Sequence, residues 1–138
     1  MNKELKKEGR YTYFEAGEGT PIIILHGLMG GLSNFDGVAN YFPKNGYKVV
    51  IPELPIYTQN ILKTNVKAFA KYVKDFITFK GYDRVILLGN SLGGHIGLYH
   101  AKMYPEKMLG LVITGSSGLY ESAMGESYAR RGVDDYIQ

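Results

Sequence analysis

The sequence predicts an α/β fold in which helices cover both faces of a mostly parallel β-sheet. Two observations lead to this prediction. Strand-like runs recur at 22–25, 47–51, 85–88 and 108–113, and the continuous apolar runs at 22–25 and 85–88 are typical of strands buried on both faces. Between several of them, apolar residues recur at intervals of three and four, which is the helical period. Strands that alternate with helices favour right-handed crossovers and parallel pairing.

The first 51 residues contain three predicted strands and one short helix. Residues 10–16 alternate aromatic and polar residues, which indicates an antiparallel edge strand or the arm of a hairpin. The first buried strand covers 22–25. A short helix capped by Asn34 follows and stops at Pro43, and it leads through a turn into the strand at 47–51.

The middle of the chain contains a longer helix over about 60–80. Gly81 is placed to end this helix in a left-handed conformation. A buried strand at 85–88 then passes through a glycine-rich turn into another helix. The strand at 108–113 follows, and residues 114–118 are predicted to form a loop. The apolar face of the longer helix is formed by Leu62, Val66, Phe69, Val73, Phe76 and Ile77.

The composition is that of an ordinary globular protein, with 45% hydrophobic and 21% charged residues and no cysteine among 138 residues. The absence of cysteine excludes disulfides and cysteine-ligated metals. The net charge of +3 arises largely from a basic N-terminal run, which we interpret as solvated surface because no nucleic-acid motif accompanies it. The sequence also lacks a signal peptide and any apolar run of membrane-spanning length, so we expect a cytoplasmic protein that binds neither nucleic acid nor membrane.

The chain changes character after residue 120. Residues 121–138 are polar, show only weak helical periodicity and contain no further apolar run. We therefore expect the sheet to be incomplete at its C-terminal side. An exposed sheet edge would favour pairing with a missing C-terminal part of the protein or with a second copy of the chain.

The segment Gly89-Asn90-Ser91-Leu92-Gly93 matches the pattern G-x-S-x-G. The pattern alone is weak, but here it lies directly after a buried strand and directly before a helix, which is the setting of a nucleophile elbow. In such an elbow a strained turn presents the serine hydroxyl at the end of the sheet, and Gly89 and Gly93 let strand and helix approach closely. The alternative is an ordinary glycine-rich strand–helix turn.

A second loop, residues 26–31, also follows a buried strand and is rich in glycine. Acyl transfer generates an oxyanion that needs two preorganised N–H donors. We expect these donors to be the backbone N–H groups of Leu28 and Leu92, because parallel strands bring both loops to the same sheet edge. The alternative is a flexible connecting loop.

These features together resemble the α/β-hydrolase family. The resemblance is carried by the strand that ends in His26-Gly27, by residues 51–55 and by residues 87–94. It implies an α/β-hydrolase fold and a serine hydrolase, either an esterase or a hydrolase that cleaves carbon–carbon bonds in ring-fission products. Ser91 would be the nucleophile, His26, Gly27, Gly89 and Gly93 would support the site, and neither a metal nor an organic cofactor is implied.

In the family, the acid and the histidine of the catalytic triad follow later strands, so the resemblance places both beyond residue 138. Within the chain, His26 and Glu121 are weak candidates for the base and the acid, and His95 and His100 are interpreted as packing or surface residues. Residues 1–120 would then form the N-terminal part of the hydrolase core, and 121–138 would begin a helical cap.

The expected reaction is therefore hydrolysis of a small acyl or ester substrate by the complete protein, with little activity from these 138 residues alone. Two alternatives remain open from the sequence: a ligand-binding or receptor-like protein on a hydrolase scaffold, and an inactive fragment of the enzyme. The substrate, the choice between ester and carbon–carbon hydrolysis and the oligomeric state are not determined by the sequence.

Overall fold

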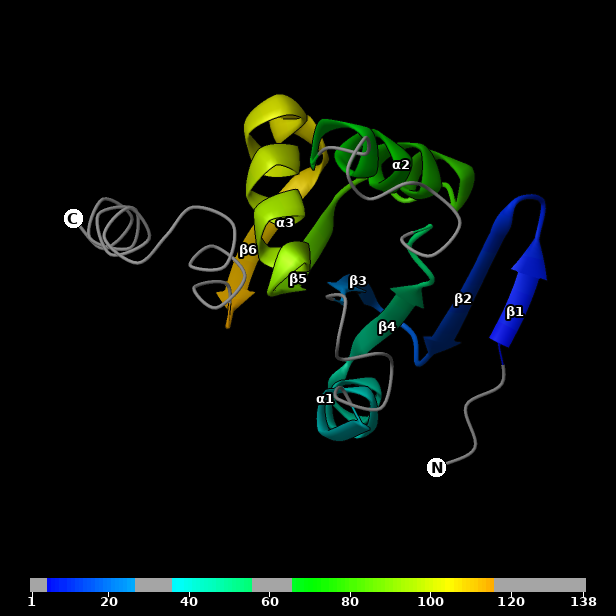
Figure 1. The fold of residues 1–138 in the computed structure, drawn as a ribbon. Coiled ribbons are helices and arrows are strands. Elements are labelled where there is room, and N and C mark those ends of the chain that lie inside the picture. The colour runs from blue at the N-terminus through cyan, green and yellow to red at the C-terminus, as the bar shows by residue number, and fades with distance from the viewer. Residues whose placement is uncertain (1–4, 27–35, 56–65, 116–138) are drawn as a thin grey trace.

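A computed structural model describes residues 5–26, 36–55 and 66–115, and in this part of the chain six strands form one sheet (Figure 1). The strands are β1 (Leu5–Glu8), β2 (Tyr11–Ala16), β3 (Thr20–Leu25), β4 (Tyr47–Pro52), β5 (Val85–Asn90) and β6 (Met108–Thr114). The helices are α1 (Asp36–Tyr41), α2 (Val66–Phe79) and α3 (Leu92–Met103), with short 3-10 helices η2 (Phe42–Asn45) and η3 (Pro105–Lys107).

The sheet is mostly parallel, as the alternation of strands and helices predicted. Its order is β1-β2-β4-β3-β5-β6, in which β4, β3, β5 and β6 run parallel and β2 runs antiparallel to β4. The strand expected over residues 10–16 is the inner arm of a hairpin, and β1 is its outer arm. The sequence did not predict β1 because three of its four residues are charged and all four are exposed.

Helices lie on both faces of the sheet, with α2 and α3 on one side and α1 on the other (Figure 1). The alternation of β3 divides its side chains between these layers. Ile23 and Leu25 belong to the core beneath α2 and α3, whereas Ile22 and Ile24 belong to the core that includes Ala39 of α1. This two-sided burial explains why the strand reads as a continuous apolar run.

Helix α2 follows the predicted apolar stripe, and Phe69, Val73, Phe76 and Ile77 are all buried. The helix ends at Phe79, and Gly81 just beyond it has the expected left-handed conformation, with a φ of +74°. The N–H of Tyr82 donates to the carbonyl of Ile77 at 3.1 Å. Residues 60–65, the predicted first turns of this helix, lie outside the described residues, as do the predicted cap Asn34 and the predicted cap segment 121–138. Among the helices that the structure describes, none has the length and apolar character needed to span a bilayer.

Strand β5 is less buried than its sequence predicted, and the neighbouring strand β6 is partly exposed. Ile86 and Leu88 of β5 are half-buried, and Leu109 and Ile113 of β6 are 54% and 41% exposed. In the described part of the chain, the face that carries α1 has only this helix of six residues as α-helical cover. Residues 22–25 of β3 are therefore buried on both faces of the sheet, whereas β5 is fully buried on one face only.

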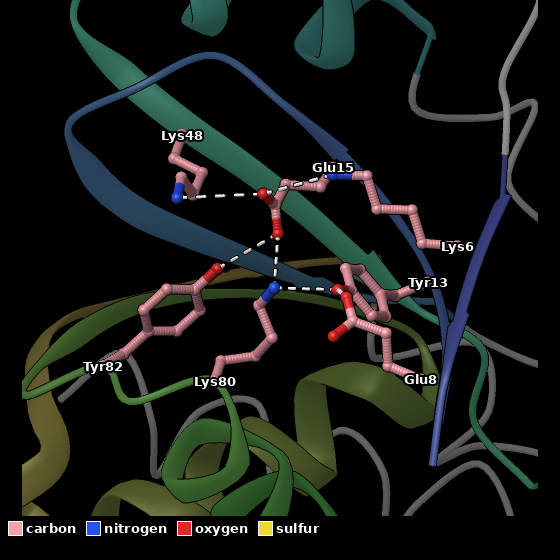
Figure 2. A network of polar contacts seen from close by, with 7 residues as sticks. All are labelled: Lys6, Glu8, Tyr13, Glu15, Lys48, Lys80 and Tyr82. Atoms are coloured by element: carbon pink, nitrogen blue, oxygen red, sulfur yellow. Dashed lines mark hydrogen bonds and ion pairs between the residues drawn. The ribbon is translucent and has the colours of Figure 1, made fainter. Parts of the chain in front are cut away.

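A polar network joins the hairpin to the end of α2, as Figure 2 shows. Lys80 Nζ donates to Glu15 Oε2 at 2.8 Å and to the hydroxyl of Tyr13 at 2.8 Å. The Tyr13 hydroxyl donates in turn to Glu8, and the Tyr82 hydroxyl donates to Glu15 Oε2 at 3.4 Å. Lys48 Nζ of β4 lies 3.8 Å from Glu15 Oε1, so the network connects the hairpin, β4 and the end of α2.

Burial, hydrogen bonds and nearby charges in this network set the protonation states of Lys80 and Tyr82. Burial disfavours the ammonium of Lys80, but its hydrogen bonds with Glu15 and Tyr13 outweigh that cost and raise its pKa. Burial, followed by the nearby charge of Glu15, raises the pKa of Tyr82 to about 12. At neutral pH, Lys80 is therefore charged and Tyr82 keeps its proton to donate.

Replacing Lys80 by Met should destabilise the protein. The Lys80 and Glu15 side chains are each only 14% exposed, so the variant leaves a largely buried carboxylate without its main partner. We expect a loss of about 2 kcal/mol in the free energy of unfolding, measured by urea denaturation. Lys71→Met is the matched control, because the Lys71 side chain is 70% exposed and lies 3.9 Å from Asp75. A loss as small as that of the control would show that the network contributes little.

Candidate active site

The carboxyl ends of β3 and β5 meet at one edge of the sheet. Leu25, the last residue of β3, pairs with Gly89 of β5. The chain therefore leaves the sheet at His26 on one strand and at Asn90 and Ser91 on its neighbour. In open parallel sheets, this edge is where ligands bind.

Ser91 occupies a tight bend between β5 and α3. Its φ of 58° and ψ of −120° make it the one non-glycine residue with a positive φ in the part of the chain that the structure describes. A serine in front of a helix commonly caps it, but the side chain of Ser91 makes no capping hydrogen bond to α3. The bend thus holds a hydroxyl-bearing residue in a conformation that is locally unfavourable, a feature that often marks functional sites.

Both backbone polar groups of Ser91 are bonded. Its N–H donates to the carbonyl of Thr114 on β6 at 3.1 Å, and its carbonyl accepts from the N–H of Gly94 on α3 at 2.9 Å. These two bonds attach the bend to a strand on one side and to a helix on the other. They fix the backbone conformation while leaving the half-buried side chain uninvolved.

Two glycines allow strand and helix to come this close. A Cβ atom on Gly93 would lie 1.9 Å from the carbonyl oxygen of Leu25, and one on Gly89 would lie 2.2 Å from the carbonyl oxygen of Gly93. Real Cβ atoms essentially never lie nearer than 3.0 Å to other heavy atoms, and here the neighbours are backbone. No other residue fits at either position without displacing α3.

His26 connects the ends of two neighbouring strands. Its side chain is 5% exposed, and its Nε2 accepts a hydrogen bond from the N–H of Leu54, just after β4, at 3.4 Å. Gly27 and Leu28, which follow it, lie outside the described residues. Of the two expected oxyanion donors, the structure thus describes only Leu92, the first residue of α3, where helical N–H groups have no intrahelical acceptor.

The other two histidines lie on α3 and differ in their surroundings. His95 is half-buried, its pKa is lowered by burial, and it lines a surface groove of about 310 Å³ together with Val66, Leu98, Tyr99 and Lys102. His100 is fully buried, and neither ring nitrogen has a hydrogen-bond partner. Burial lowers the pKa of His100 to about 4, against a smaller opposing effect of Glu106. Glu121, the candidate acid, lies outside the described residues.

The structure adds one residue to the site that the sequence did not predict. Thr114 was expected in a loop, but it is the last residue of β6 and pairs with Asn90. Its hydroxyl lies 3.2 Å from Asn90 Oδ1. The expected parallel pairing could have indicated this residue, because a strand that begins at residue 108 beside β5 must extend to residue 114 to pair with Asn90.

Among the described residues, no group of three or more His, Asp or Glu side chains could hold a metal ion.

Comparisons with known proteins agree on one family. The model of the family described as "alpha/beta hydrolase fold" matches residues 20–133. Over 114 residues the chain is 33% identical to the 2-hydroxy-6-oxo-6-phenylhexa-2,4-dienoate hydrolase of Comamonas testosteroni, covering 78% of this chain and 40% of that protein. It is 26% identical over 125 residues to Lipase 1 of Psychrobacter immobilis, covering 86% and 39%.

A solved structure is more similar still. MGS-MChE2, an alpha/beta hydrolase enzyme from the metagenome of lagoon sediments at Mar Chica, Morocco, is 55% identical with a TM-score of 0.77. The match covers 94% of this chain and 63% of that one. The chain therefore spans about 40% of the length of the curated relatives and less than two thirds of this solved relative.

The two glycines lead to a test of the close packing at the bend. Gly93→Ala should destabilise the protein by about 3 kcal/mol or more, because the methyl group would overlap a strand carbonyl. Gly37→Ala is the control, because nothing lies within 4 Å of a Cβ there and alanine favours the helix. Thermal unfolding of both variants checks the expectation, and a Gly93→Ala variant as stable as the control would contradict it.

The buried His100 leads to a prediction about pH. The folded protein keeps this ring neutral down to about pH 4, whereas the unfolded chain takes up a proton below about 6.5. The stability of the parent should therefore fall as the pH is lowered from 6.5 to about 4. His100→Leu should show a smaller fall over the same window in urea denaturation. Equal falls in both proteins would show that His100 does not cause the dependence.

Proposed function

The chain belongs to the alpha/beta hydrolase fold family, and on this premise we propose that Ser91 is the nucleophile of a serine hydrolase. In the proposal, the backbone N–H groups of Leu92 and Leu28 bind the oxyanion that forms when Ser91 attacks an acyl carbon. The activity is proposed for the complete protein in which this chain occurs.

The conformation of Ser91 carries the proposal. A positive φ at a serine is costly, and here the surrounding backbone holds it through bonds to Thr114 and Gly94. Ser91 lies where strand β5 ends and helix α3 begins, next to the positive end of the helix dipole. A purely structural strand–helix turn would have no need of a side chain in this position, and glycine would fit it at lower cost.

The reaction proceeds in two steps. The oxygen of Ser91 forms a bond to the acyl carbon as its proton passes to a histidine, and the leaving group departs with that proton. A water molecule then attacks the acyl-serine, which releases the acid product and restores the hydroxyl. The two backbone N–H groups stabilise the negative charge on the carbonyl oxygen in both steps, which typically contributes a factor of about 10²–10³ per donor.

The three histidines of this chain are unsuited to act as the base. His26 is buried and accepts from Leu54, and His100 is enclosed in the core below α3. His95 follows Ser91 by four residues on the same helix and faces the groove beside Val66. The proposal therefore takes the base from a part of the complete protein outside these 138 residues.

The relatives narrow the substrate to two kinds of acyl compound. The curated relatives at 29–33% identity include hydrolases of 2-hydroxy-6-oxo-dienoates, whose reaction cleaves a carbon–carbon bond, while the lipase acts on esters. Both reactions use the same proposed attack on a carbonyl carbon. We therefore propose a small acyl substrate, either an ester or a ring-fission product.

The proposal predicts that a fluorophosphonate probe labels Ser91 in the full-length protein. Ser91→Ala should abolish both labelling and turnover of short p-nitrophenyl esters or of a 2-hydroxy-6-oxo-dienoate. Labelling is measured by intact mass and located by peptide mapping. Thr78→Ala is the control, because it removes an exposed hydroxyl on α2 that bonds only to the carbonyl of Lys74. Full turnover by the Ser91→Ala variant would remove this residue from the mechanism.

A further inference from the structure

The end of β6 contacts the bend at Ser91 through two different groups of one residue. The carbonyl of Thr114 accepts from the N–H of Ser91 at 3.1 Å. The hydroxyl of Thr114 lies at hydrogen-bonding distance, 3.2 Å, from Oδ1 of Asn90. One residue therefore holds the main chain of Ser91 and the side chain of the residue before it.

The position of Thr114 is itself set by a regular ladder. Leu88, Gly89 and Asn90 pair in parallel with Val112, Ile113 and Thr114. The residue that holds the bend is thus the last rung of a strand and not part of an adaptable loop. A displacement of Thr114 would require the ladder between β5 and β6 to shift.

Gly115 leaves room for this arrangement. It has a φ of +59°, and a Cβ atom on it would lie 2.6 Å from Asn90 Oδ1. Directly after Thr114, Gly115 therefore adopts a left-handed conformation that costs glycine little. The side chain of Asn90 occupies the space that another residue at 115 would fill.

We infer that Thr114 is a positioning residue for the nucleophile that acts through its hydroxyl, which holds the side chain of Asn90 and with it the backbone that leads into Ser91. The carbonyl bond to Ser91 is a backbone contact that any residue at 114 would make. This inference rests on the proposed role of Ser91. The conformation of Ser91 is locally unfavourable, so it persists only where neighbouring contacts hold it. A bend that relaxes carries the hydroxyl away from its line of attack, and a displacement of about 1 Å can lower a rate by about a hundredfold.

A purely structural role makes a different prediction. If the hydroxyl of Thr114 only stabilises the end of β6, its removal lowers the melting temperature and leaves the reactivity of the folded protein unchanged. If it positions the site, the reactivity of Ser91 falls in protein that is still folded. The rate of labelling by a fluorophosphonate, measured below the melting temperature, separates the two roles.

The test compares four variants of the full-length protein with the parent. Thr114→Val removes the hydroxyl and keeps the branched shape and the carbonyl, so labelling and kcat should fall at least about tenfold with KM within about twofold. Thr114→Ser restores the hydroxyl and should recover the parent's rates to within about threefold. Gly115→Ala displaces Asn90 and should slow labelling in the same way. Thr78→Val makes the same chemical change on the exposed face of α2 and should leave the rates unchanged.

The outcomes separate this inference from the proposed function. A parent that is not labelled at Ser91 contradicts the proposed function. If the parent is labelled and Thr114→Val is labelled at the same rate, only the positioning role is overturned. The same conclusion follows if Thr114→Ser is labelled as slowly as Thr114→Val. If Thr114→Val does not fold, Gly115→Ala provides the test instead. Labelling of Gly115→Ala at the parent's rate would then overturn the inference.

Discussion

At its N-terminal end, helix α3 meets the sheet through backbone contacts. Gly93 of the helix lies against the carbonyl of Leu25, and Gly89 of β5 lies against the carbonyl of Gly93, each at a distance where a methyl group cannot fit. This contact fixes how far the helix stands from the strands. Because the strand must end and the helix must begin within that distance, the chain has a single residue, Ser91, in which to turn.

The strain at Ser91 follows from this contact and is offset elsewhere. A residue held in such a conformation typically costs about 1–3 kcal/mol. Each backbone hydrogen bond contributes about 1 kcal/mol, so the bonds to Thr114 and Gly94 together can offset the cost of the Ser91 conformation. One of these partners is local, but Thr114 is distant in sequence and is brought there by the sheet. The bend therefore depends on the tertiary fold, and the five-residue pattern around Ser91 alone would not maintain it.

The sequence predicted the features that depend on local patterns. The apolar runs located β3, β4, β5 and β6, the helical stripe located α2, and Gly81 marked where α2 ends. The pattern of glycines around Ser91 predicted a close approach of strand and helix. These signals are strong because each records a constraint on nearby residues, either burial on one face or a backbone conformation that only glycine adopts readily.

The features that the sequence missed depend on distant partners. Strand β1 is charged and exposed, and it pairs only because β2 folds back beside it. Thr114 looked like the start of a loop, because its role comes from the ladder with Asn90. The interpretation of His100 as a packing or surface residue left its environment open, and the structure buries it without a hydrogen-bond partner. In each case the missing information is the identity of a neighbour across the sheet or beneath a helix.

The polar network that joins the hairpin to α2 and the bend at Ser91 lie at opposite ends of the parallel strands. Lys48 and Tyr82 of the polar network lie at the amino-terminal ends of β4 and β5, whereas Ser91 lies at the carboxyl-terminal end of β5. The network gains stability from well-matched charges around Glu15, while the bend at Ser91 costs stability. Since the strain is confined to one residue whose backbone is fully bonded, the cost stays local, and the remaining fold can hold this conformation without loosening around it.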